Sequence, residues 1–246
     1  MSDKPLALIL AVTSDIGRAV AHACAASGYD LIVTARDRQR LDAEVADLDQ
    51  RYPAAVKGIV LDVLDHDQHR QVLDQLPSLP DLCVCAIGLM PPQEQVRSDP
   101  ELAGKVMQTN YIASALLLEM LAERCRERGS GSIVGISSVA GDRGRQSNYV
   151  YGSAKAGFTA YLSGLRGRMH GHGVAVITVK PGFVHTRMTE GMALPAWLTA
   201  EPEQVARCIL RAVKKRRQVI YVKGLWRVIM FVIRALPERL FVRLNL

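Results

Sequence analysis

The sequence predicts a three-layer α/β domain built on a doubly wound parallel sheet of seven strands. Apolar runs rich in Val and Ile alternate with longer segments of helical period, and the 246-residue chain is 49% hydrophobic, which is ample for one large core. We expect strands at residues 6–11, 31–35, 56–61, 82–87, 132–137, 174–180 and 218–222. We expect helices at residues 16–27, 37–50, 66–76, 101–128, 149–170 and 203–215. No linker or repeat interrupts this alternation, so residues 1–223 are expected to form one domain.

The stretch AVTSDIG, residues 11–17, follows the first strand and precedes a helix, as a dinucleotide-binding turn does. Ala11 and Asp15 stand where that pattern has glycine, whereas Gly17 remains where the helix must approach the strand. Backbone amides at the helix N-terminus and nearby hydroxyls still favour a pyrophosphate. We expect Asp15 to cap the helix with its carboxylate facing away from the phosphates, and an ordinary capped turn is the alternative. The predicted cofactor contacts here are Thr13, Ser14, Asp15, Ile16 and Gly17.

The second strand ends in Thr34-Ala35-Arg36, with no carboxylate at its last position. An NAD site has an acidic residue there for the ribose hydroxyls, whereas an NADP site has arginine for the 2′-phosphate. Arg36, with Arg38 or Arg40 nearby, therefore predicts NADP(H). Because Asp37 follows immediately, NAD(H) stays open as the alternative.

Three residues after the fifth strand form a set suited to carbonyl chemistry. Ser138 ends that strand, and Tyr151 and Lys155 lie four residues apart on one face of the next helix. A phenol titrates near about pH 10, and an adjacent ammonium together with an oxidised nicotinamide would lower that pKa. Tyr151 is then a general acid or base, and Ser138 can orient a substrate carbonyl. Asp142, Arg143 and Arg145 lie in the loop between, where we expect solvated charges or recognition of an anionic substrate.

The C-terminal segment, residues 224–246, is basic and amphipathic. Residues 214–246 carry nine Lys or Arg against one acidic residue, whereas residues 1–213 carry 22 against 23. Interleaved Trp226, Met230 and Phe231 favour a peripheral contact with an acidic membrane over nucleic acid, which we do not expect as a partner. A helix from about Leu225 should end before Pro237. Packing of this helix on its own domain or on a second subunit is the alternative.

The five cysteines are scattered, and no secretory signal precedes the first strand. We therefore expect a reduced cytoplasmic protein, with any membrane contact at the inner face, and no metal site.

The chain resembles the short-chain dehydrogenases/reductases from about Leu6 to Val222. The resemblance lies in the segment YGSAK around Tyr151, in Ser138 thirteen residues before it, in QTNYIAS around Asn110, in VLDV and in KPGFVHTRM. CAIG, residues 85–88, departs from the Asn-Asn-Ala-Gly that is usual in the family.

The resemblance implies a single Rossmann domain that forms a homodimer or homotetramer. It implies that Asn110 holds a water in a proton relay from Lys155, and that Tyr151 and Lys155 also contact the cofactor. The further cofactor contacts that it implies are Asp62, Val63, Ala86, Gly88, Pro181, Gly182, Val184 and Thr186. The segment after Thr186 would be a lid, and its apolar residues suggest an apolar or lipid-linked substrate. The tail is similar to that of family members that reduce keto-sugars carried on polyprenyl phosphate.

The sequence thus predicts an NADP(H)-dependent oxidoreductase that reduces a carbonyl to an alcohol or catalyses the reverse reaction. An NAD(H)-dependent member of the family is one alternative. The other is a catalytically weak nucleotide-binding scaffold or redox sensor, to which the lost glycines point.

Overall fold

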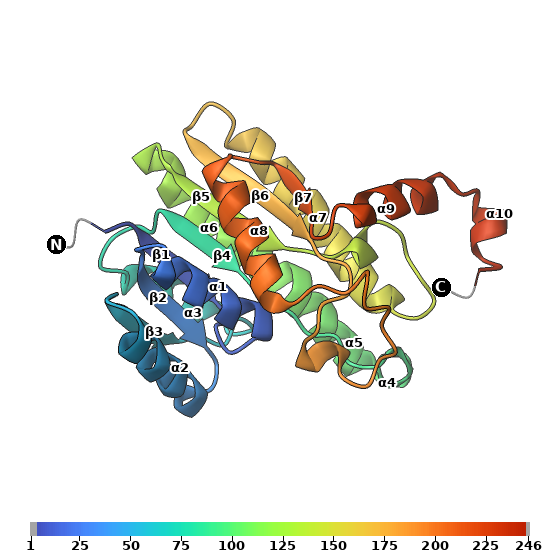
Figure 1. The fold of residues 1–246 in the computed structure, drawn as a ribbon, viewed down its shortest axis with the longest axis horizontal. Coiled ribbons are helices and arrows are strands. Elements are labelled where there is room, and N and C mark those ends of the chain that lie inside the picture. The colour runs from blue at the N-terminus through green and yellow to red at the C-terminus, as the bar shows by residue number, and fades with distance from the viewer. Residues whose placement is uncertain (1–3, 245–246) are drawn as a thin grey trace.

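The structure is a computed structural model that describes residues 4–244. Seven parallel strands form one sheet in the order β3-β2-β1-β4-β5-β6-β7, with helices on both faces (Figure 1). The strands are β1 Leu6–Leu10, β2 Asp30–Ala35, β3 Val56–Val60, β4 Leu82–Cys85, β5 Gly131–Ile136, β6 Val174–Lys180 and β7 Val219–Tyr221. This architecture confirms the predicted doubly wound sheet, and every expected strand is present.

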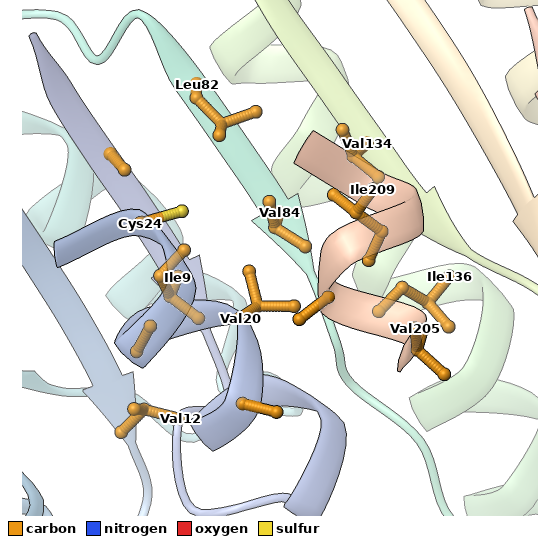
Figure 2. Packing of buried hydrophobic residues seen from close by; sticks show 14 of the residues in the cluster. Ile9, Val12, Val20, Cys24, Leu82, Val84, Val134, Ile136, Val205 and Ile209 are labelled. Carbon is orange, nitrogen blue, oxygen red and sulfur yellow. The ribbon is translucent and has the colours of Figure 1, made fainter. Parts of the chain in front are cut away.

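Two helical layers enclose the sheet because the central strands are buried and apolar toward both faces. The helices are α1 Asp15–Ala26, α2 Arg38–Arg51, α3 His66–Asp74, α4 Gln93–Ser98, α5 Pro100–Met107, α6 Ala113–Arg128, α7 Tyr149–Arg168, α8 Pro202–Lys214, α9 Leu225–Ala235 and α10 Glu238–Phe241. On one face α1 and α8 pack side by side over the central strands, where Val20 and Ile209 meet Val84 (Figure 2). On the other face α3, α6 and α7 bury Leu73, Leu118 and Phe158.

Two of the helical features that were not predicted lie between β4 and α6. The segment expected as one helix over 101–128 contains a π-helical stretch, Gln108–Ile112, between α5 and α6. Single π-helical turns inside α-helices often occur at functional sites, and this one carries Asn110. The short helix α4 buries only Val96, so its six residues have no apolar period that a sequence could show.

The C-terminal helix α9 begins at Leu225 and ends before Pro237, as predicted. Its inner face packs on the domain, with Trp226 and Met230 buried against Val139 and Leu198. The alternative of packing on its own domain therefore holds for this face, while Val228 and Phe231 on the other face are exposed. Within residues 4–244 no helix is long and apolar enough to cross a membrane.

Candidate active site

The predicted site residues converge on one cavity of about 460 Å³ at the carboxyl ends of the strands, where doubly wound sheets bind ligands. The predicted residues that line it are Thr13, Ser14, Asp15, Ile16, Arg36, Asp62, Val63, Ala86, Gly88, Ser138, Tyr151, Lys155, Pro181, Gly182, Val184 and Thr186. Gly17 and Asn110 do not line the cavity, and each supports residues that do. A larger, open groove of about 1200 Å³ lies between α1, α2 and the segment after Thr186, but Ser138, Tyr151 and Lys155 do not reach it.

The turn at residues 11–17 keeps a glycine-type backbone despite its substitutions. Ala11 has a φ of 66°, in the left-handed region that favours glycine. At Gly17 a Cβ would lie 2.2 Å from the Ala11 carbonyl oxygen, so no larger residue fits. Ser14 caps α1, because its Oγ accepts a hydrogen bond of 3.1 Å from the Gly17 amide. The expectation that Asp15 caps the helix is therefore wrong: Ser14 already occupies the N-cap, and Asp15 is the first residue inside the helix.

The Asp15 carboxylate instead binds Arg187, in the segment that follows Thr186. The Arg187 amide donates to Oδ2 at 2.9 Å, and its Nε donates to Oδ1 at 3.1 Å. The same guanidinium donates to the carbonyl oxygen of Thr13. The charge of Asp15 is thus balanced within the chain, and the predicted lid is tied to the predicted phosphate turn. Arg187 was not among the predicted site residues, because its only local signal in the sequence is a cation directly after Thr186.

Arg36 lies exposed at the end of β2 and lines the cavity. The adjacent Asp37 is engaged elsewhere: its Oδ1 accepts a hydrogen bond of 2.9 Å from the Arg40 amide and caps α2. The charge available to a ligand at this strand end is therefore positive.

Lys155 is buried between the ends of two strands. Its Nζ donates to the carbonyl oxygens of Ile136, at 3.0 Å, and Ile87, at 3.3 Å. Nζ lies 5.8 Å from the centre of the Tyr151 ring. Ser138 borders the same cavity as Tyr151, and its Oγ accepts a hydrogen bond of 3.1 Å from the Ala140 amide.

Burial moves both pKa values away from those expected. It raises the pKa of Tyr151 to about 12, against a smaller opposing effect of the Ser138 hydrogen bond. It lowers the pKa of Lys155 to about 8. The expected lowering of the Tyr151 pKa is therefore not found in the protein alone, because loss of water penalises the charged form of both groups.

Asn110 fixes the wall beneath Lys155. Its Nδ2 donates to the carbonyl oxygens of Leu89, at 2.7 Å, and Val106, at 2.8 Å, and its Oδ1 accepts from the Leu89 amide at 3.1 Å. A Cβ on Gly88 would lie 3.5 Å from that Oδ1 and 3.9 Å from Lys155 Nζ. The π-helical stretch thus holds the loop after β4 against Lys155.

The active-site loop, residues 139–148, is held by the C-terminal part of the chain. Asp142 forms a buried ion pair with Lys180 and accepts a hydrogen bond of 2.8 Å from the Tyr221 hydroxyl. Arg143 donates to carbonyl oxygens at the end of α9. The expectation of solvated charges is wrong for these two residues, because strands and helices distant in sequence surround them. Trp226 completes the anchor, since a Cβ on Gly182 would meet its ring at 1.9 Å.

A doubly wound sheet whose carboxyl edge carries a phosphate turn and a Ser, Tyr and Lys set defines a dinucleotide-dependent oxidoreductase. Comparison with known proteins agrees. Residues 5–195 match the family model described as short chain dehydrogenase. The chain is 37% identical over 228 residues to an uncharacterized oxidoreductase of Mycobacterium tuberculosis, covering 92% of this chain and 91% of that protein.

Two solved structures share the fold with different cofactors. A short-chain dehydrogenase from Sphingobium yanoikuyae in complex with NADPH superposes with a TM-score of 0.81 at 24% identity, covering 95% of this chain and 97% of that one. A 3-oxoacyl-[acyl-carrier protein] reductase from Brucella melitensis in complex with NAD superposes with a TM-score of 0.80 at 23% identity, covering 93% of this chain and 99% of that one. The protein belongs to the short-chain dehydrogenase family and is an NAD(P)-dependent dehydrogenase or reductase.

Proposed function

We propose that this enzyme reduces a carbonyl to an alcohol with NADPH, or catalyses the reverse reaction. The observation that carries the proposal is the convergence of Ser138, Tyr151 and Lys155 on the cavity that the phosphate turn also borders. Bound NADPH supplies the hydride. Ser138 orients the carbonyl oxygen, and Tyr151 donates the proton from its phenol oxygen to the forming alkoxide. With a pKa of about 12, Tyr151 is fully protonated at neutral pH, as a proton donor must be.

Lys155 and Asn110 support the proton transfer. The ammonium of Lys155 stabilises the phenolate that forms on Tyr151. The side-chain amide of Asn110 already forms hydrogen bonds with the backbone of Leu89 and Val106, so it is not free to bind a water. We therefore assign the water of the relay to backbone carbonyl groups of the π-helical stretch, which the Asn110 side chain holds in place.

The preference for NADP(H) rests on Arg36. Its guanidinium is free of the adjacent carboxylate because Asp37 caps α2, so it can bind a 2′-phosphate through two hydrogen bonds. Arg36→Ala should weaken NADPH binding about tenfold or more and leave NADH binding nearly unchanged. Arg97→Ala, an exposed arginine on α4 outside the cavity, is the matched control. Equal affinity of the wild type for the two cofactors would support NAD(H) use instead.

The reaction class is tested by Tyr151→Phe. We expect this variant to lose turnover of aldehyde and ketone substrates and to keep NADPH affinity, because only the phenol hydroxyl is removed. Turnover retained in the variant would refute the assignment. Cofactor binding by the wild type without turnover across a broad carbonyl panel would favour the nucleotide-binding scaffold or redox sensor.

The substrate end of the cavity favours an apolar or lipid-linked molecule. Leu89, Met90, Phe183, Met188 and Met192 line it. We also propose that the exposed face of α9 contacts an acidic membrane, since Phe231 is 75% exposed and Arg227 and Arg234 flank it.

Sedimentation with phosphatidylglycerol vesicles tests the membrane contact. Phe231→Glu should reduce binding severalfold, whereas Val219→Glu, at the sheet edge, should not. Deleting the tail is a poorer test, because Trp226 also supports Gly182. Equal binding of Phe231→Glu and wild type would contradict this contact.

We further propose that the chain forms a homodimer or homotetramer. Met107, Ile112 and Leu116 are exposed along the continuous α5–α6 segment, where a partner subunit would cover them. Light scattering should show an oligomer that Leu116→Arg dissociates; a monomeric wild type would contradict the proposal.

A further inference from the structure

Arg145 is a partly buried cation in the active-site loop that forms no ion pair within residues 4–244. Its Nε is buried and has no hydrogen-bond partner among the described residues. In the described part of the chain, its Nη2 donates only to the sulfur of Met230, at 3.3 Å. The carboxylate of Asp142 in the same loop acts on Arg145 electrostatically, but it is already paired with Lys180 and Tyr221. Arg145 borders the cavity that holds Ser138 and Tyr151.

Arg143, two residues earlier in the same loop, differs from Arg145 because its guanidinium is paired within the chain. Its Nη1 donates to the carbonyl oxygens of Ile233 and Leu236, each at 2.6 Å, and its Nη2 donates to Glu238 at 2.7 Å. Its guanidinium carbon lies 4.0 Å from the centre of the Phe241 ring. Arg143 thus anchors the tail through several strong hydrogen bonds, whereas Arg145 hydrogen-bonds to it only at the sulfur of Met230 among the described residues.

A partly buried cation with a buried, unpaired Nε is unfavourable unless an anion binds to it. Burial lowers the pKa of Arg145 from its ordinary 12.5, yet an arginine stays charged at neutral pH. A second unsatisfied group lies beside it: Asn148 Oδ1 is buried without a partner in the described chain. The backbone amide of Asn148 donates to the backbone carbonyl oxygen of Arg145 at 3.1 Å. This turn places both side chains at the cavity. Turned over, the Asn148 side-chain amide would present its NH₂ group to an oxyanion.

We infer that Arg145, assisted by Asn148, binds an anionic group of the substrate, a carboxylate or a phosphate ester, while Ser138 and Tyr151 hold its carbonyl. The inference rests on the proposed function and narrows its substrate class. The apolar side chains that line the same cavity, such as Met90 and Met188, surround the rest of the molecule. The substrate is therefore an amphipathic acid that carries a carbonyl.

Binding to the NADPH-saturated enzyme tests the anion site without turnover. Decanoate, decyl phosphate and the neutral decanamide are titrated calorimetrically into wild type, Arg145→Met, Arg145→Lys and Arg143→Gln. Wild type should bind at least one anion about ten- to a hundredfold more tightly than decanamide, as charge-assisted hydrogen bonds imply. The anion that is preferred distinguishes a carboxylate from a phosphate ester. Arg145→Met should abolish the preference, Arg145→Lys should keep part of it, and Arg143→Gln should keep all of it.

Equal binding of anions and amide by the wild type, or an unchanged preference in Arg145→Met, would overturn the inference. Reduction of 10-oxodecanoate and its methyl ester then separates it from the proposed function. Equal kcat/KM for acid and ester refutes the anion site and leaves carbonyl reduction standing. Arg145-dependent binding of decanoate without turnover of any aldehyde refutes carbonyl reduction and leaves the anion site standing.

Discussion

The phosphate turn and the active-site loop both border one cavity, and each places a charged side chain there. At the turn, Asp15 stands where the family pattern has glycine, and Arg187 meets its carboxylate with two hydrogen bonds. In the loop, Arg145 has a buried Nε with no partner in the described chain. A charge that the chain itself neutralises belongs to the framework, whereas a buried charge left unmet is available to a ligand. The difference separates residues that shape the site from residues that select what enters it.

The largest expected effect compares the two loop arginines in stability. Arg143→Met should lower the free energy of unfolding by about 2–3 kcal/mol, because it leaves carbonyl groups at the end of α9 unpaired. Arg145→Met should leave that free energy unchanged or raise it, because methionine removes a partly buried cation whose Nε has no partner among the described residues. Urea unfolding followed by circular dichroism measures both. Equal destabilisation by the two substitutions would show that Arg145 is structural and break the comparison.

The ion pair at the turn is expected to control cofactor affinity. Arg187→Met leaves the Asp15 carboxylate unpaired beside the phosphate site, so the Kd for NADPH should rise about tenfold. Asp15→Gly removes the carboxylate and frees Arg187, so the Kd should fall severalfold. The double variant should bind more tightly than Arg187→Met alone, as quenching of protein fluorescence by NADPH can measure. If Arg187→Met binds NADPH like the wild type, the pair has no role in cofactor binding.

The pH dependence of reduction should follow Lys155. Its pKa is lowered from 10.5 to about 8, so the ammonium is present below about pH 8 and lost above it. Tyr151, with a pKa of about 12, stays protonated throughout this range. We therefore expect kcat/KM for carbonyl reduction to be level up to about pH 8 and to fall about tenfold per unit above it.

The melting temperature, measured over the same pH range, separates this fall in kcat/KM from unfolding of the protein. The unfolded chain keeps the Lys155 proton up to about pH 10.5, whereas the folded chain releases it near 8. The contribution of Lys155 to stability thus rises with pH between these values, and the melting temperature should show no loss from this group. A kcat/KM that stays level to pH 10 would contradict the assigned role of Lys155.

The sequence could predict the strands because parallel strands covered on both faces are continuous apolar runs. It could predict Tyr151 and Lys155 because four residues on a helix bring side chains to one face. It could not predict that Asp15 binds Arg187, since 172 residues separate them. Nor could the sequence show that Arg145 forms no ion pair with Asp142. That carboxylate is instead bound by Lys180 and Tyr221, which come from two other strands. Charge pairing across a fold has no local pattern, so the sequence located the cavity better than the roles of its charged residues.

The smallest expected effect concerns an uncharged residue of the phosphate turn, Ala11, and is a change in melting temperature. Ala11 adopts a φ of 66°, which is unfavourable for any residue with a Cβ by about 1 kcal/mol. Ala11→Gly should therefore raise the melting temperature by about 2–4 °C, even though glycine gains more freedom in the unfolded chain. Ala43→Gly, at an exposed position inside α2, is the matched control and should lower it, because the backbone there is helical. A lower melting temperature in both variants would mean that Ala11 is not strained in the folded protein. Alanine at this position of the turn would then cost no stability relative to glycine.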